Sequence, residues 1–335
     1  MKVGIAGAEG VGKSLLFSLW LSPQSKPLKT LKGTMGRVDL DDPLFFQLVQ
    51  MLQPKTFTPP SADLVELPST PSRNPVEFLR QHLPGLDLII YLFGVFQNPD
   101  VRNPQEALEK DFLFADAELV EHILNNLEKL VSKGQKERIT EWKFFQRVQA
   151  HLQQGKPIRE MNLTPEERHF LSAYPLLSSL RIVYLLNVAD EQVKDFLPFK
   201  RENLYIASIR LEKELSELEE AERSSFLRAY GLSEFLLPEL KKNIPALSGH
   251  IFFYTIVGDD CRAWDIPENS TALQAAGRIH TDFARGFVKA EVLSATDFLR
   301  AGSLSNARNL GFVHLEGKDY TVKYGDILTI RFAKV

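Results

Sequence analysis

The chain has 335 residues, of which 44% are hydrophobic and 25% are charged, and its formal net charge is −3. This composition is ordinary for a globular protein with a buried core, and the length suits two or three domains. The net charge argues against a chain that binds polyanions through its overall charge. The sequence has one cysteine, which excludes an intrachain disulfide, and no apolar run as long as a membrane span. The single cysteine fits a reducing compartment. Because no basic flank precedes an apolar stretch at the N-terminus, we expect no signal peptide, and we expect no segment that spans a membrane.

The first fourteen residues carry the strongest motif. Residues 1–7 are largely apolar and predict a short strand, and residues 15–20 predict the start of a helix. Between them, residues 7–14 read Gly-Ala-Glu-Gly-Val-Gly-Lys-Ser, which fits the phosphate-binding loop in the strand–loop–helix setting that it needs. Glycines let backbone N–H groups wrap phosphates, and a helix N-terminus adds its positive end. The motif predicts a site for ATP or GTP together with Mg²⁺.

Three side chains of this loop have predicted roles. Lys13 would reach the outer phosphates, and the Ser14 hydroxyl would hold Mg²⁺. Glu9 either points to solvent or weakens phosphate binding by its negative charge. The alternative for the whole segment is a glycine-rich turn with a surface lysine. The predicted nucleotide-binding residues of the loop are Gly7, Glu9, Gly10, Val11, Gly12, Lys13, Ser14 and Leu15.

Strands and helices then alternate along the chain. Strands are predicted over residues 62–67, 86–93, 180–187 and 203–208. Helices are predicted from residue 41 and over residues 78–83, 214–230 and 233–242. Nearly continuous apolar strands that alternate with helices are typical of a doubly wound, parallel α/β sheet.

Residues 104–180 have a different character. Helical periodicity without breakers covers residues 106–131, and residues 138–152 predict a second helix, so we expect a helical hairpin inserted in the α/β domain. Residues 164–167 form a capping box with proline at the first helical position. Residues 129–159 contain eight Lys or Arg and two Asp or Glu. This basic stretch indicates either a solvated helical face or a contact with the phosphate backbone of RNA.

A third part follows Pro245 and Gly249. It contains predicted strands at residues 251–257, 286–292, 320–322 and 327–332 and a predicted helix at residues 271–279, which indicates a separate α+β module. Its acidic and basic residues are equal in number, so charge identifies no partner for it. We predict a nucleotide-binding domain over residues 1–103 and 181–247, a helical insertion over residues 104–180, and a C-terminal domain over residues 248–335.

Together these features resemble the YchF subfamily of Obg-like ATPases along nearly the whole chain. The most specific stretches are residues 262–264, 279–283, 286–287, 290–292 and 315–320, which resemble the family's ubiquitin-like TGS domain. The resemblance implies a P-loop domain of doubly wound parallel α/β fold with an inserted α-helical hairpin and a C-terminal α+β TGS domain. It also implies a cytoplasmic nucleotidase that prefers ATP to GTP and associates with ribosomes.

The resemblance also implies which residues hold the metal ion. Residues 27–30 resemble the family's first switch, so Thr30 would reach Mg²⁺ when the terminal phosphate is present. The alternative for Thr30 is an ordinary loop threonine. With Ser14 from the loop and Glu66 after the next strand, the predicted metal ligands are Ser14, Thr30 and Glu66.

The second switch departs from the family pattern. Residues 66–69 read Glu-Leu-Pro-Ser where the family has Asp-x-x-Gly. Glu66 keeps the charge but is one methylene longer, and Ser69 keeps an N–H but adds a side chain that restricts the backbone. Residues 70–75 form a proline-rich loop in place of a glycine-rich switch, which stiffens a segment that should be mobile. We therefore expect slow hydrolysis.

The candidate base-binding residues are Asn187, Val188, Asp190 and Ser208. Residues 187–190 take the place of the Asn-Lys-x-Asp motif of GTPases, in which the Asp accepts two N–H groups from guanine and the Lys stem covers the ring. The subfamily lacks the Lys and ends the motif in Glu, which disfavours guanine. This chain has Val188 in place of the Lys but ends in Asp190, so the two departures point in opposite directions. The alternative for Asp190 is a helix cap.

The leading interpretation is a divergent YchF-like nucleoside triphosphatase that acts as a ribosome- or RNA-associated switch. Contacts to RNA or the ribosome would involve the basic hairpin and the TGS domain. No Gln or His is visible in the second switch to orient an attacking water, so no catalytic residue is assigned. The alternative is a degenerate nucleotide-binding scaffold with little or no hydrolysis, which the altered Asp-x-x-Gly motif favours.

Overall fold

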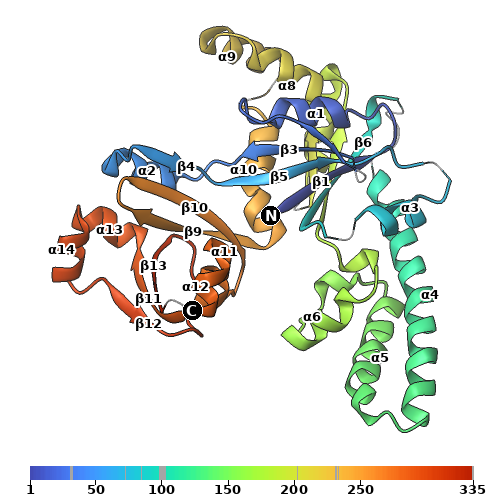
Figure 1. Cartoon of the computed structure of the whole chain (residues 1–335). Coiled ribbons are helices and arrows are strands. Elements are labelled where there is room, and N and C mark those ends of the chain that lie inside the picture. Colours follow the sequence, from blue (N-terminus) through green and yellow to red (C-terminus); the bar gives the residue numbers. More distant parts are fainter. Residues whose placement is uncertain are drawn as a thin grey trace.

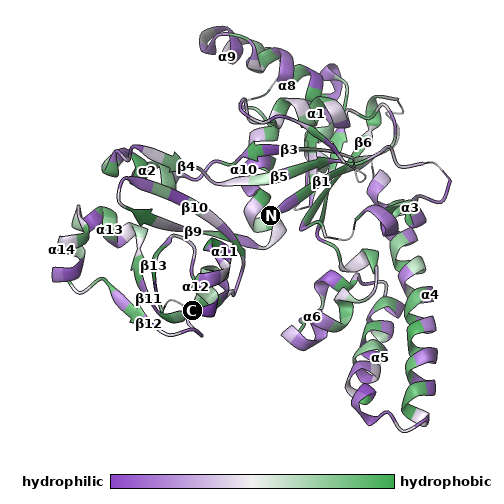
Figure 2. Ribbon diagram, in the orientation of Figure 1, coloured by the Kyte–Doolittle hydropathy of each residue, from purple (hydrophilic) through white to green (hydrophobic). Residues whose placement is uncertain are grey.

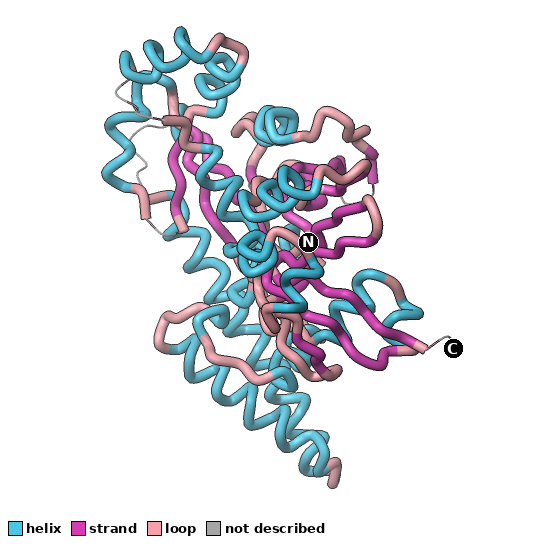
Figure 3. The backbone as a smooth tube through the Cα atoms, turned by 90° about the vertical axis from the view of Figure 1, so that its left-hand side faces the viewer, coloured by secondary structure: helices cyan, strands magenta, loops and turns pink. Residues whose placement is uncertain are grey.

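The computed structural model describes residues 1–30, 33–71, 73–83, 85–97, 103–201, 203–230, 232 and 234–333. Figure 1 shows three parts: an α/β body at the upper right, a helical arm below it, and a second sheet with its helices at the left. In Figure 3 the strands gather in the middle of the molecule and the long helices extend away from them. Within the described part, no helix combines the length and the apolar character that a membrane crossing requires.

The first sheet has seven strands in the order β2-β3-β5-β1-β6-β7-β8. Their bounds are β1 (Lys2–Gly7), β2 (Leu28–Thr30), β3 (Gly33–Asp39), β5 (Ser61–Glu66), β6 (Leu88–Gly94), β7 (Ile182–Asn187) and β8 (Leu204–Ala207). The five strands from β5 to β8 run parallel, whereas β3 is antiparallel to both β5 and β2. β7 is buried along its whole length, as its continuous apolar run predicted. The expected parallel α/β sheet is confirmed.

Helices cover both faces of this sheet. They are α1 (Lys13–Trp20), α3 (Pro75–His82), α7 (Val193–Phe196), α8 (Ile209–Ser216), α9 (Glu220–Ala229) and α10 (Leu237–Ser248). Successive residues of β1 point to opposite faces, because side chains alternate along a strand. Ile5 packs in one core with Leu16 of α1 and Leu240 of α10. Ala6 packs in the other core with Leu79 of α3, so the fold is doubly wound.

The prediction of one helix over residues 214–230 is wrong. The structure has two helices, α8 and α9, and the Arg223 side chain donates to the carbonyls of Leu215 (3.2 Å) and Leu218 (2.8 Å) where the chain turns between them. Both carbonyls therefore accept hydrogen bonds from a side chain at the place where the helical backbone hydrogen bonds of α8 end. The helix predicted over residues 233–242 is α10, which begins at Leu237, and residue 233 lies outside the described residues.

The helical insertion consists of α4 (Pro104–Ser132), α5 (Ile139–Gln153) and α6 (Pro165–Ser172). Val120 of α4 and Phe145 of α5 are fully buried in a core of their own, and Thr164 makes the predicted capping box with Glu167. Figure 2 shows that β6 of the central sheet is mostly apolar, whereas α6 on the arm is mostly hydrophilic. Short 3-10 turns lie at Val95–Gln97, Lys136–Arg138, Ile158–Glu160, Leu177–Ser179, Asp190–Gln192 and Leu197–Phe199.

The second sheet has six strands in the order β12-β11-β13-β9-β10-β4. They are β4 (Thr56–Thr58), β9 (His250–Val257), β10 (Asp260–Pro267), β11 (Phe287–Ser294), β12 (His314–Glu316) and β13 (Asp326–Phe332). The helices of this part are α2 (Pro43–Leu52), α11 (Ala272–Ile279), α12 (Thr281–Arg285), α13 (Ala295–Ala301) and α14 (Leu304–Asn309). The strand predicted over residues 320–322 is wrong, since only an isolated bridge joins Thr321 to Thr271.

An N-terminal segment completes the second sheet. β4 pairs in parallel with β10, about 200 residues further along the chain. Asp42, at the start of α2, accepts hydrogen bonds from the hydroxyls of Tyr254 and Tyr324, both at 2.7 Å. The domain prediction assigned residues 1–103 wholly to the nucleotide-binding domain. It therefore did not include the packing of α2 and β4 with the second sheet. The remaining domain limits stay predictions.

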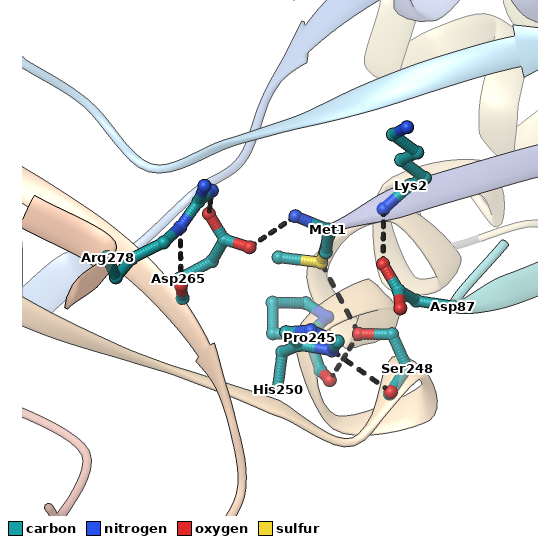
Figure 4. A network of polar contacts seen from close by, with 8 residues as sticks. All are labelled: Met1, Lys2, Asp87, Pro245, Ser248, His250, Asp265 and Arg278. Atoms are coloured by element: carbon teal, nitrogen blue, oxygen red, sulfur yellow. Dashed lines mark hydrogen bonds and ion pairs between the residues drawn. The ribbon is translucent and has the colours of Figure 1, made fainter. Parts of the chain in front are cut away.

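A second contact between the two sheets involves the start of β1 (Figure 4). The Met1 amino group pairs with Asp265 of β10, which also accepts from Arg278 of α11 at 2.5 Å. The Lys2 N–H donates to the Asp87 carboxylate at 2.7 Å, just before β6. The strand that leads into the phosphate loop is therefore tied to the C-terminal sheet as well as to its own.

Candidate phosphate-binding site

The loop between β1 and α1 lies at the carboxyl end of the central sheet. Gly12 has a φ of 103°, and a Cβ there would lie 2.6 Å from the side-chain nitrogen of Asn187, so the position requires glycine. The loop opens on a cavity of about 560 Å³. The residues that line this cavity are Glu9, Gly10, Gly12, Lys13, Ser14, Leu15, Gly33, Thr34, Glu66, Leu67, Pro68 and Ser69.

Lys13 is the first residue of α1, and only 7% of it is exposed. Its ammonium group donates to the carbonyls of Gly7 (2.9 Å) and Ala8 (2.6 Å) and to the Ser69 hydroxyl (3.1 Å). Burial lowers the pKa of Lys13, and the negative charges of Glu66 and Glu9 act in the opposite direction. The cation predicted to meet phosphate is thus at the cavity, and the charge of Glu9, which also lines the cavity, opposes the lowering of the Lys13 pKa by burial.

The Ser14 hydroxyl donates a hydrogen bond to the Glu66 carboxylate. The structure therefore brings together two of the three predicted metal ligands. A hydroxyl and a carboxylate are oxygen ligands of the kind that Mg²⁺ takes, usually with water and substrate phosphates in the remaining positions. The described residues contain no cluster of three or more His, Cys, Asp or Glu that would bind a metal ion without a substrate. The ligand set fits a metal ion that arrives with a phosphate.

The third predicted ligand, Thr30, lies elsewhere. It belongs to β2, its hydroxyl donates to the Gly33 carbonyl at 2.8 Å, and it is not among the described residues that line the cavity. Thr34 of β3 does line the cavity, and it pairs with Glu66 in the register of β3 and β5. No sequence pattern pointed to Thr34, because its position depends on the pairing of two strands. The role of Thr30 stays a prediction.

The candidate base-binding residues are buried and hydrogen-bonded within the protein. Asn187 donates to the Val11 carbonyl (3.0 Å) and accepts from the Ile209 N–H (3.1 Å), so it joins the loop to β7 and α8. Ser208 is the N-cap of α8 and accepts from the Leu211 N–H at 3.3 Å. Val188 is 2% exposed. These contacts position the loop and the first turn of α8.

Asp190 is held by two partners. Its carboxylate accepts a hydrogen bond from the Ser208 hydroxyl and pairs with Arg210 at 2.5 Å, and its side chain is 7% exposed. The pKa of the Arg210 guanidinium is raised by this hydrogen bond and by the charge of Asp190. The capping alternative for Asp190 is wrong, because the side chain that caps this turn is Gln192, which accepts from the Ala189 N–H. No sequence pattern pointed to Arg210, since only the fold brings it to Asp190.

Comparison with known proteins extends the likeness beyond the loop. The family model YchF-GTPase_C, described as a protein of unknown function, matches residues 250–333. The chain is 28% identical to the ribosome-binding ATPase YchF of Bacillus subtilis over 99% of both chains. It is 27% identical to Obg-like ATPase 1 of Rattus norvegicus over 99% of this chain and 92% of the relative. The solved structure of the Schizosaccharomyces pombe YchF GTPase matches at a TM-score of 0.78 and 23% identity, over 99% of this chain and 97% of that one.

Proposed function

We propose that the chain is a divergent member of the YchF subfamily of Obg-like ATPases, to which it is similar over 99% of its residues, and that it is a slow, Mg²⁺-dependent nucleoside triphosphatase. The observation that carries this proposal is the placement of Lys13 and Ser14 at one cavity, with Glu66 against the Ser14 hydroxyl. A cation and a hydroxyl at the start of a helix, with a carboxylate at the end of the neighbouring strand β5, form an arrangement that suits a triphosphate with its metal ion.

Hydrolysis at this site rests on position and charge. The loop N–H groups and Lys13 would neutralise the charge that develops on the transferred phosphoryl group. Mg²⁺, when bound, supplies further neutralisation and orients the phosphate oxygens. The residues that line the cavity in the described part of the chain include no Gln or His that would orient an attacking water. Slow turnover is the consequence.

Ribosome association is the second part of the proposal. Relatives of this chain carry the name ribosome-binding ATPase, and a protein that binds ribosomes works in the cytoplasm. On the helical insertion, three arginines of the basic stretch are neutralised by glutamates: Arg138 by Glu141, Arg147 by Glu167 and Arg159 by Glu109. The lysines of the stretch are exposed, and we assign the RNA-binding role to them. They are Lys129, Lys133, Lys136, Lys143 and Lys156.

Salt dependence tests this assignment. Replacing Lys133, Lys136 and Lys143 with Gln should weaken binding to ribosomes and reduce the slope of log affinity against log salt by about 2, since each lysine that neutralises a phosphate adds roughly 0.7 to that slope. The slope is measured by ribosome co-sedimentation at several salt concentrations. An unchanged slope would assign the interaction to another part of the chain. A matched control variant carries the same change at Lys194, Lys213 and Lys242.

Calorimetric titration with ATP, GTP, ADP and GDP, with and without Mg²⁺, tests the nucleotide site. Lys13→Ala should lower triphosphate affinity by about a hundredfold or more, since each hydrogen bond from a charged group contributes roughly 1.5–3 kcal/mol. Ser14→Ala should remove the dependence on Mg²⁺ without altering the buried contacts of Lys13. Circular dichroism confirms that both variants fold. Equal affinity in Lys13→Ala and the parent would refute the site.

A further inference from the structure

The Ser69 hydroxyl takes one of the three hydrogen bonds that Lys13 donates. A lysine ammonium group has three N–H donors, and here they point to the carbonyls of Gly7 and Ala8 and to Ser69. Two of these acceptors belong to the loop itself. The third, Ser69, comes from the segment after β5 and lies 3.1 Å from the lysine nitrogen. A phosphate that binds Lys13 must therefore displace at least one acceptor.

The segment that carries Ser69 is fixed on both sides. The Leu67 N–H donates to the Ile5 carbonyl at 3.0 Å, and the Thr70 N–H donates to the Gly7 carbonyl at 2.9 Å. Leu67 is 2% exposed, and Pro68 holds its own φ within a narrow range. Ser69 thus stands between two residues that are hydrogen-bonded to β1, the strand that leads into the loop. Its hydroxyl is a fixed acceptor for Lys13, whereas a glycine there would offer none.

The residue at the start of this segment also contacts the loop, because Glu66 accepts the hydrogen bond of Ser14. One stretch of four residues, 66–69, therefore contacts both side chains through which the phosphate loop would act. Glu66 is a carboxylate and suits a metal ion as well as it suits Ser14, so it can stay in place when Mg²⁺ binds. Ser69 is different, because its hydroxyl oxygen competes for the same ammonium group as a phosphate oxygen.

We propose that Ser69 determines the preference of this site between nucleoside triphosphates and diphosphates. The inference rests on the proposed function and adds a specificity to it. The loop N–H groups hold the inner phosphates in either ligand, and Lys13 reaches the β-phosphate in a diphosphate but both the β- and the γ-phosphate in a triphosphate. A triphosphate must therefore displace one more acceptor of Lys13 than a diphosphate does, and Ser69 is the acceptor that lies outside the loop. The site consequently favours diphosphates more than a phosphate loop without this serine does, and it retains its hydrolysis product.

Calorimetric titration with ATP and ADP, each with Mg²⁺, measures this preference in the chain of 335 residues. Ser69→Ala removes the hydroxyl and keeps the backbone restricted, and Ser69→Gly removes both constraints. Each variant should raise the ratio of the ADP dissociation constant to the ATP dissociation constant by about tenfold. The loss of one hydrogen bond to a charged group changes a dissociation constant by roughly that factor. Ser18→Ala is the matched control, since the Ser18 hydroxyl bonds the Leu15 carbonyl and Ser18 is absent from the described cavity lining.

The outcomes separate the two proposals. A shift in both Ser69 variants, with the ratio unchanged in Ser18→Ala, supports the role of Ser69. A ratio within twofold of the parent in Ser69→Ala, with binding intact, overturns that role and leaves the nucleotide site standing. If neither the parent nor any variant binds a nucleotide, the proposed function fails and the role of Ser69 fails with it.

Discussion

The replacement of Asp-x-x-Gly by residues 66–69 predicts a specific rate defect. Glu66 reaches one methylene further than Asp and contacts Ser14, which shifts the place where a metal-bound water would lie. At Ser69 the turn is restrained by Pro68 and by the Thr70 N–H, which donates to the Gly7 carbonyl at 2.9 Å. A backbone N–H that misses the terminal phosphate in the transition state costs roughly 3 kcal/mol, or about a hundredfold in rate. Restoring the motif should recover much of this factor.

The double variant Glu66→Asp with Ser69→Gly tests the defect. We expect its kcat to exceed that of the parent by about ten- to a hundredfold, within the range set by one oxyanion donor. Phosphate release at saturating ATP or GTP and Mg²⁺ measures kcat, and each single variant shows which position limits the rate. A parent that turns over at about 1 s⁻¹ or faster, as many enzymes do, would refute the reasoning. A double variant no faster than the parent would also contradict it.

Two further predictions concern buried carboxylates. Asp116 is fully buried and accepts hydrogen bonds from the N–H groups of Leu177 (3.0 Å) and Ser178 (2.7 Å). Asp116→Ala should therefore lower the free energy of unfolding, measured by urea denaturation, by about 3 kcal/mol. A loss below about 1 kcal/mol would contradict this. Burial raises the pKa of Glu212 from 4.5 to about 7, against the effect of hydrogen bonds from the Leu236 and Leu237 N–H groups. Between pH 4.5 and about 7, the folded chain keeps a proton on Glu212 that the unfolded chain releases. The free energy of unfolding should therefore fall as pH rises through this range, by about 1.4 kcal/mol per pH unit and by at most about 3 kcal/mol in total. Glu212→Gln should flatten the dependence of Tm on pH, and an unchanged slope would show that another group titrates.

Local patterns were enough to predict the phosphate loop and most of the sheet. The loop lies between β1 and α1 because glycines at positive φ, a lysine and a serine follow an apolar strand directly. The helical hairpin was equally visible, since α4 runs for 29 residues without a breaker. In each of these cases the sequence signal, whether a motif, an apolar run or a helical periodicity, lies within one short segment. The match of residues 250–333 to a YchF family model supports the motifs recognised in the C-terminal part.

Contacts between distant strands could not be predicted in this way. β4 has only three residues, two of them exposed, so it shows no alternating pattern, and it becomes a strand through its pairing with β10. Thr34 reaches the cavity because the register of β3 places it opposite Glu66. Both facts depend on which strands pair and in what register, and a single sequence does not contain that information in any local pattern.

The pairing of Asp190 with Arg210 predicts which of two opposite departures from the GTPase motif decides the base preference. An Asp at this position favours guanine only if its carboxylate is available to accept two N–H groups from the base. Here the carboxylate accepts from Ser208 and pairs with Arg210 at 2.5 Å, so guanine would have to displace a charge-assisted hydrogen bond. We therefore expect Arg210→Ala to raise the affinity for GTP relative to ATP by about tenfold, the strength of one such bond. Titration of the parent, Arg210→Ala and Arg210→Lys with both nucleotides measures the ratio. Arg210→Lys keeps a cation beside Asp190 and should stay near the parent. A GTP-to-ATP ratio that does not change in Arg210→Ala would show that Asp190 does not contact the base, whatever its partner.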